Sequence, residues 1–364
     1  MLGKAKLHCA LRKLFLRTAM IALVLIMISE AYAQDSKYAG AFLEIPVGGR
    51  ALSMGGAYTG IADDESAFHW NPAGVSLMDH KYLGMMYSSE FGIPGSALAN
   101  FFHLGFTLPL ENVSIAANWV RLAVGDLSHT PDLTGINITA ERERMVRDAL
   151  AGSQDLFSDT EDAFVLSIAR DNKFILDWGW LYYAHPVEVP IGVNFKYIRQ
   201  KVGTFGQAQG IGVDAGIMLR FSLGDYLLMP FLGKLALAVN VTDIGGTKLV
   251  WSTERPHTIP MRIVGGASYA QDLPFINTVV TLAGDFTVHE SEKPRLGIDF
   301  TYLENISVRA GLNKGFFATG AGFVWEKRLK VDYSLSLHDL GPEHRLSFGV
   351  DIDNFLKYAF PAKE

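Results

Sequence analysis

The chain has 364 residues, of which 49% are hydrophobic, 12% aromatic and 19% charged, and its net charge at pH 7 is −6. This acidic balance argues against nucleic acid as a partner, because phosphate binding needs clustered Lys and Arg. The single cysteine, Cys9, excludes a disulfide within the chain.

Residues 1–33 have the pattern of a secretory signal peptide. Five basic residues precede a short apolar stretch at 19–28, and the small-x-small sequence Ala31-Tyr32-Ala33 follows it. The stretch is too short to anchor the chain comfortably in a bilayer. Cleavage would leave 27 Lys and Arg against 37 Asp and Glu, a net charge of −10, and no cysteine. Because no later apolar run could form a membrane helix, a membrane protein with this sequence would have to be a closed β-barrel.

Residues 34–78 show no two-residue alternation and contain a glycine-rich stretch at 48–58 followed by an acidic stretch at 63–74. The glycine pairs allow tight backbone paths and close approach to neighbouring strands. We expect Asp63 and Asp64 to cap a short helix, with Glu65 and Ser66 in its first turn. The Asn71-Pro72 pair predicts the turn that ends this helix.

The acidic stretch permits other interpretations. Its carboxylates and His69 could bind a metal ion, although helix capping explains the same acidic residues. The glycine pairs do not form a phosphate loop, since no Gly-Lys-Ser/Thr follows them. No nucleophile-base pair stands out, so a barrel hydrolase is the least favoured function, and we expect neither an enzyme nor a cofactor.

From residue 79 onward, apolar and polar side chains alternate with a period of two, which is the period of a β-strand. In the clearest example, Leu346, Phe348 and Val350 oppose Ser347 and Gly349. Fourteen segments are predicted to be strands: 82–91, 97–108, 113–124, 163–170, 188–201, 208–221, 234–244, 261–270, 277–289, 293–303, 305–314, 317–327, 329–338 and 344–352.

A soluble β-sandwich also alternates, but the alternating stretches within these segments run about eight to eleven residues and their polar faces carry full charges beside glycines. A lipid-facing strand has about this length, with polar side chains on the lumen side. The sequence therefore predicts an all-β fold, a membrane-spanning antiparallel up-and-down β-barrel of about fourteen strands over residues 79–352, with a C-terminal tail at 353–364 or a last strand that runs to Phe355. The side chains expected to line the lumen are Asn194, Lys196, Asp214, Arg220, Asn240, Arg262, Asp285, Asp299, Arg309 and Asp332.

An even strand number places both termini in the periplasm. The connections at 125–162, 202–207 and 245–260 then face outside, and residues 140–152 in the first of them predict a short surface helix with a solvated charged face. The connections at 171–187 and 222–233 are long for periplasmic turns. The first contains Trp178, Trp180, Tyr182 and Tyr183, which are typical of a membrane interface.

The compound motif of residues 48–74, a Gly-Gly-Arg-x-x-x-Met-Gly-Gly-Ala stretch followed by acidic residues and Trp-Asn-Pro-Ala-Gly, resembles the PorV/PorQ proteins of the FadL-like outer-membrane barrel superfamily. Segments 192–197, 240–246 and 309–312 are similar too. The resemblance implies that residues 34–78 form a plug in the barrel lumen, with Asn71, Pro72 and Ala73 shaping the passage. The plug motif comprises Gly48, Arg50, Met54, Gly55, Gly56, Asp63, Asp64, Trp70, Asn71, Pro72, Ala73 and Gly74.

The same resemblance implies a non-enzymatic protein in the lipid of the outer membrane, linked to type IX secretion, whose loops at 125–162 and 245–260 would contact secretion-system proteins and exported cargo. The alternative is a FadL-like channel for hydrophobic small molecules. The lumen residues favour neither, because acidic and basic side chains offset each other and indicate a polar, internally paired interior without a ligand-sized apolar pocket.

Overall fold

A computed structural model describes residues 40–90, 98–128, 133–152, 156–177, 185–252, 256–288, 293–338 and 341–359. The expected signal peptide lies outside these residues. Sixteen strands occur in them: β1 (Tyr82–Glu90), β2 (Ala99–Pro109), β3 (Ser114–Ser128), β4 (Leu156–Leu176), β5 (His185–Val202), β6 (Gly206–Ser222), β7 (Lys234–Thr242), β8 (Thr247–Trp251), β9 (Pro256–Ile259), β10 (Arg262–Leu273), β11 (Thr278–Thr287), β12 (Arg295–Tyr302), β13 (Ile306–Asn313), β14 (Phe316–Trp325), β15 (Leu329–Ser336) and β16 (Glu343–Asp351).

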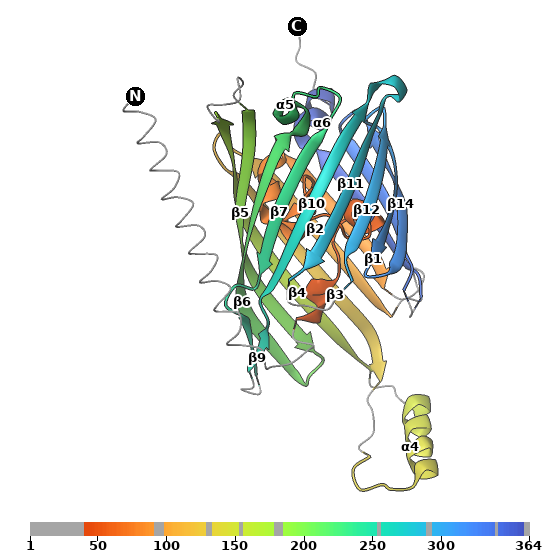
Figure 1. Cartoon of the computed structure of the whole chain (residues 1–364). Coiled ribbons are helices and arrows are strands. Elements are labelled where there is room, and N and C mark those ends of the chain that lie inside the picture. The colour runs from red at the N-terminus through yellow and green to blue at the C-terminus, as the bar shows by residue number, and fades with distance from the viewer. Residues whose placement is uncertain are drawn as a thin grey trace.

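Fourteen of the described strands close into one antiparallel barrel (Figure 1). Each strand pairs with the next along the chain, β7 pairs with β10, and β1 pairs with β16 so that Tyr82 lies opposite Asp351. The remaining two strands, β8 and β9, form a hairpin. In this hairpin β8 also pairs with β6 near the beginning of β6, at Ala208–Gly210. The expected antiparallel barrel is confirmed, and the connection at 245–260 contains this hairpin.

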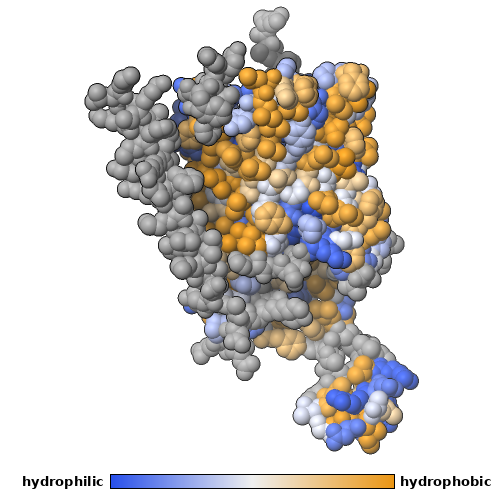
Figure 2. Space-filling model, in the orientation of Figure 1, coloured by the Kyte–Doolittle hydropathy of each residue, from blue (hydrophilic) through white to orange (hydrophobic). Residues whose placement is uncertain are grey.

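The barrel is apolar outside and polar inside. Along β5, Phe195 and Tyr197 are exposed, whereas Asn194 and Lys196 are buried. The same arrangement, with apolar side chains outside and polar side chains inside, holds round the wall. Hydrophobic side chains cover much of the visible surface in Figure 2. Outward-facing examples are Phe102, Leu104, Phe106, Phe164, Leu166, Ile168, Leu237, Val239, Leu282, Phe286, Phe300, Val308, Phe317 and Phe323. An apolar outer surface over a polar interior is typical of a membrane-spanning β-barrel.

The N-terminal segment folds into the lumen as short helical turns, drawn in red and orange in Figure 1: η2 (Ala41–Glu44), α2 (Gly49–Ser53), α3 (Ala67–Trp70) and η3 (Pro72–Leu77). The predicted capping is partly wrong. Helix α3 begins only at Ala67, and Asp64 instead accepts hydrogen bonds from the backbone and hydroxyl of Ser66 just before it. The helix does end where Asn71 becomes extended, and the Asn71 side chain accepts from the Ala73 amide.

Helix α4 (Thr139–Gly152) stands away from one end of the barrel on the β3–β4 connection, as Figure 1 shows, and confirms the predicted surface helix. The opposite end carries α5 (Leu223–Leu227), η4 (Pro274–Ile276) and α6 (Ile352–Ala359). Helix α6 corrects the alternative expectation that the last strand runs to Phe355, because the chain from Ile352 to Ala359 is helical. None of the described helices is long and apolar enough to cross a membrane.

The connection expected at 171–187 differs from the prediction. Strand β4 ends at Leu176 and strand β5 begins at His185, so both strands reach into the range that was assigned to this connection. Its four aromatic residues lie outside the described part of the chain. The connection at 222–233 is long, as expected, and helix α5 occupies part of it.

Candidate functional site: the lumen plug and the cavity beside it

The plug, which we define as residues 40–78, packs directly against the barrel backbone at inward-facing glycines. A Cβ atom on Gly311 would lie 2.5 Å from the carbonyl oxygen of Met54, and one on Gly192 would lie 2.6 Å from the amide nitrogen of Ala73. Both distances are shorter than van der Waals contact allows, so the main chains can approach only because these strand residues lack side chains. The plug is therefore a fitted part of the interior.

Side chains of the barrel also bind the plug backbone. The carboxylate of Asp285 accepts hydrogen bonds from the amides of Tyr58 and Thr59, both at 2.9 Å, and the hydroxyl of Ser347 accepts from Gly49 at 2.7 Å. Tyr58 and Thr59 lie in the irregular stretch after α2, and Gly49 is the first residue of α2, whose amide has no acceptor within the helix. Because an unpaired buried amide is costly, the acceptors on the wall fix the plug in one position.

Lys330 on β15 joins the plug to the wall by ion pairs. Its ammonium lies 2.9 Å from Asp64, 3.4 Å from Glu65 and 3.2 Å from the wall residue Asp332. The Lys330 ammonium and the Arg50 guanidinium overcome the effect of burial and hold the pKa of Asp64 well below its usual range. Burial, opposed by Lys330 but reinforced by Asp64, raises the pKa of Glu65 to about 7.

The ion pairs continue round the lumen through two arginines. Arg309 lies 2.9 Å from Asp299 and 2.6 Å from Asp332, and Arg50 of the plug lies 2.6 Å from Asp63 and 3.5 Å from Asp299. Together with Lys330, these groups form a connected network of three cations and five carboxylates. Burial, reinforced by the neighbouring carboxylates Asp64 and Asp332, raises the pKa of Glu65 in this network to about 7, so Glu65 is partly protonated near neutral pH.

A second cluster holds the other side of the plug. Lys196 lies 2.7 Å from Asp214 and 2.8 Å from Asp243, and the neighbouring Asn194 donates to the main-chain oxygen of Phe68 at 2.7 Å. Both carboxylates of this cluster therefore lie beside the Lys196 ammonium.

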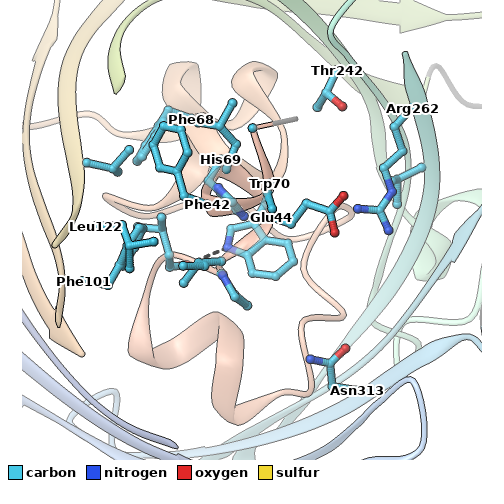
Figure 3. A pocket seen from close by; sticks show the side chains of 18 of the residues that line it. Phe42, Glu44, Phe68, His69, Trp70, Phe101, Leu122, Thr242, Arg262 and Asn313 are labelled. Carbon is cyan, nitrogen blue, oxygen red and sulfur yellow. Dashed lines mark hydrogen bonds between the residues drawn. The ribbon is translucent and has the colours of Figure 1, made fainter. Parts of the chain in front are cut away.

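Next to the plug, on the side of the barrel end that carries α4, lies a cavity of about 790 Å³. Figure 3 shows aromatic and aliphatic side chains on one wall, among them Phe42 and Phe68 of the plug with Phe101 and Leu122 of the barrel. The opposite wall is polar and includes Arg262. Other polar residues of the lining include Glu44, Glu90, Lys196, Asp214, Arg295, Asn313, His338 and Arg345.

The expectation of no ligand-sized apolar pocket is only partly right, because the cavity is ligand-sized and has one apolar wall, while its other wall is polar. It was drawn from the strand residues, whose inward faces are polar. The plug contributes Phe42 and Phe68 to the apolar wall, and neither belongs to a periodic pattern that could have placed it.

The structure distributes the residues predicted to line the lumen over three places. Asp285, Asp299, Arg309 and Asp332 contact the plug or its ion-pair network. Asn194, Lys196, Asp214, Asn240 and Arg262 border the cavity. Arg220 lies near the end with α5, pairs with Glu188 at 3.3 Å and does not border the cavity.

The charged lumen residues that were not predicted include Lys330 and Arg345. Lys330 alternates in phase with Asp332 and Ser334, and Arg345 with Ser347, so their strand phase already indicated an inward direction. Arg345 is 1% exposed and pairs with Glu90 at 2.9 Å.

Within the plug motif, Met54, Asn71, Pro72, Ala73 and Gly74 are buried. Gly48, Gly55 and Gly56 adopt positive φ angles. Trp70 donates from its indole nitrogen to the Val47 oxygen at 2.8 Å.

The possible metal site has no counterpart in the described residues, where no group of three or more His, Cys, Asp or Glu side chains could hold an ion. Asp63 and Asp64 are instead engaged with Arg50 and Lys330.

Comparison with known proteins gives a partial family match and a likeness of fold. The model of Uncharacterised protein family (UPF0164) matches residues 19–96. A UPF0164 protein of Treponema pallidum (strain Nichols) is 45% identical over 47 residues, which make up 13% of this chain and only 12% of that protein. These matches do not test the resemblance to PorV/PorQ proteins.

Several solved structures are similar to most of the chain at low identity. A TodX deltaS2S3 mutant monoaromatic hydrocarbon channel has a TM-score of 0.42 and 12% identity, covering 84% of this chain and 99% of that one. The Ralstonia pickettii toluene transporter TbuX has a TM-score of 0.43 and 12% identity, covering 84% and 97%. A Pseudomonas aeruginosa FadL homologue has a TM-score of 0.41 and 10% identity, covering 83% and 97%.

Proposed function

We propose that this protein is an outer-membrane barrel that takes up a hydrophobic small molecule through the cavity between its plug and its long connections. The observation that carries the proposal is the cavity itself. Its volume of about 790 Å³ falls in the usual range for small-molecule sites, and an apolar wall faces a polar, partly cationic one. Such a site suits a molecule with an apolar body and a polar or anionic end.

The wall that contains Phe101 provides a test with an internal control. Phe101 is 1% exposed and lines the cavity, whereas Phe106 on the same strand is 38% exposed on the outer surface. Because truncating a buried phenylalanine in a binding site removes about 1.5–3 kcal/mol of apolar contact, Phe101→Ala should weaken binding roughly tenfold or more. Phe106→Ala should leave binding unchanged.

The measurement is the affinity of the purified, folded barrel for the fluorescent fatty acid cis-parinaric acid. Saturable binding lost in Phe101→Ala and retained in Phe106→Ala supports the proposal. No saturable binding to the unaltered protein, or equal losses in both variants, would contradict it.

A second candidate function is the cargo contact in type IX secretion that the PorV/PorQ resemblance implies. The observation in its favour is α4, which stands clear of the barrel at the end with the long connections, where a protein partner can reach it. Deleting residues 133–152 should then leave secreted proteins in the periplasm while ligand binding by the barrel persists. Normal export and surface anchoring of every cargo in that deletion would count against the secretion role.

A further inference from the structure

The end of the barrel opposite α4 exposes large apolar side chains on its turns. Leu228 and Phe231 follow α5 and are 58% and 69% exposed, and Phe275 in η4 is 80% exposed. Turns that face water are usually polar, so this number of exposed apolar residues at one end of the molecule indicates contact with something other than water. Figure 2 shows hydrophobic surface reaching this end of the barrel.

Helix α6 adds an amphipathic element to the same end. Its residues Ile352, Phe355, Leu356 and Ala359 recur at the spacing that places them along one side of a helix. The opposite side is polar and holds the helix onto the barrel, since Asp353 pairs with Lys81 at 3.1 Å. The apolar residues Phe355 and Leu356 remain exposed although the helix is tied down.

Aromatic contacts link α6 to the outer surface of the wall. Tyr358 contacts Trp325, with ring centroids 6.2 Å apart, and the guanidinium of Arg328 lies 4.0 Å from the Tyr358 ring. Trp325 is the last of the outward-facing residues of β14, which also include Phe317 and Phe323. The exposed side of α6 is thus continuous with the apolar surface of the barrel.

From this continuity we propose that α6 lies in the phospholipid headgroup layer next to this end of the barrel, with Phe355 and Leu356 directed towards the acyl chains. Trp, Tyr and Arg collect at that depth because each combines an apolar body with a polar tip. An eight-residue helix is only about 12 Å long and cannot span a bilayer, but it can lie along the interface. The occupant of the exposed face is lipid, and the helix fixes the depth of the barrel in the membrane.

The experiment compares two adjacent residues of α6, one on its apolar side and one on its polar side. Cys9 is the only cysteine, so Cys9→Ser provides a background for Leu356→Cys and, as the matched control, Lys357→Cys. Each variant carries a nitroxide label in vesicles of phosphatidylethanolamine and phosphatidylglycerol, and Phe323→Cys on the outer wall calibrates contact with lipid. Folding of each variant is checked by its heat-dependent mobility in SDS gels.

The readout is the accessibility of each label to oxygen, which concentrates in lipid, relative to a water-soluble nickel complex. The ratio at position 356 should exceed that at 357 several-fold and approach that at 323. Equal access of nickel to both α6 positions would show that the helix faces water and would overturn the proposal. Protection of position 356 from both reagents would overturn it too, since a protein surface would then cover the helix.

Discussion

Replacing Lys330 by methionine is expected to destabilise the folded barrel by about 3 kcal/mol, because it removes a cation that three buried carboxylates share. Lys330 is the ion-pair partner of Asp64, Glu65 and Asp332, whose side chains are 8%, 6% and 1% exposed. Methionine keeps most of the volume of the lysine stem, so the loss reports the charge. The destabilisation should be smaller at pH 5 than at pH 8, because Glu65, whose pKa burial raises to about 7, is protonated at pH 5 and then needs no cation.

The measurement is urea unfolding of the protein in vesicles at both pH values. The control is Lys327→Met, which breaks the ion pair between Lys327 and Glu304, both 70% exposed, and should have no measurable effect. If Lys330→Met unfolds at the same urea concentration as the parent protein, the ion-pair network does not stabilise the plug in the lumen.

Gly311→Ala is expected to displace the plug while leaving the barrel closed. The new Cβ atom would overlap the backbone of Met54 and Gly55, which cannot rotate away as a side chain could. Overpacking of this kind typically costs about 1–3 kcal/mol. The control is Gly284→Ala on the neighbouring wall, where a Cβ would lie 3.4 Å from the Leu296 side chain, an ordinary contact.

Trypsin provides the readout for plug position. Arg50 is the only Lys or Arg between residues 38 and 80, and its side chain is 20% exposed in the seated plug. Cleavage after Arg50 should be several-fold faster in Gly311→Ala than in the parent protein or Gly284→Ala, with the barrel still resistant. Identical cleavage in all three proteins would mean that the plug does not depend on this close approach.

The fourteen strands could be predicted because alternation records which face of a strand meets lipid. Strand β4 was expected at 163–170 but runs from Leu156 to Leu176. Its additional residues include Asp159 and Lys173, and they do not continue the apolar alternation. Where a strand extends beyond the apolar band, neither face is selected for apolar side chains, and the periodic signal ends before the strand does.

The candidate site was less predictable for a different reason. The contacts of the plug join residues far apart in the chain, such as Gly49 and Ser347, and involve irregular backbone that has no periodic pattern. Compositional motifs could mark residues 48–74 as unusual, but they could not show that Phe42 and Phe68 turn towards the same cavity as Phe101. The inward direction of the Lys330 side chain, by contrast, follows from the alternation along β15, where Lys330 shares a face with Asp332 and Ser334.

The apolar face of every barrel strand is expected to contact lipid. The most direct measurement is photo-crosslinking of the folded protein in vesicles that contain a phospholipid with a photoreactive acyl chain, followed by mapping of the attachment sites by mass spectrometry. We expect the lipid to be attached at outward residues such as Phe195, Leu237 and Phe300, and not at the buried residues Asn194 and Asp299. Recovery of the folded protein in the aqueous fraction without lipid attached would contradict this expectation.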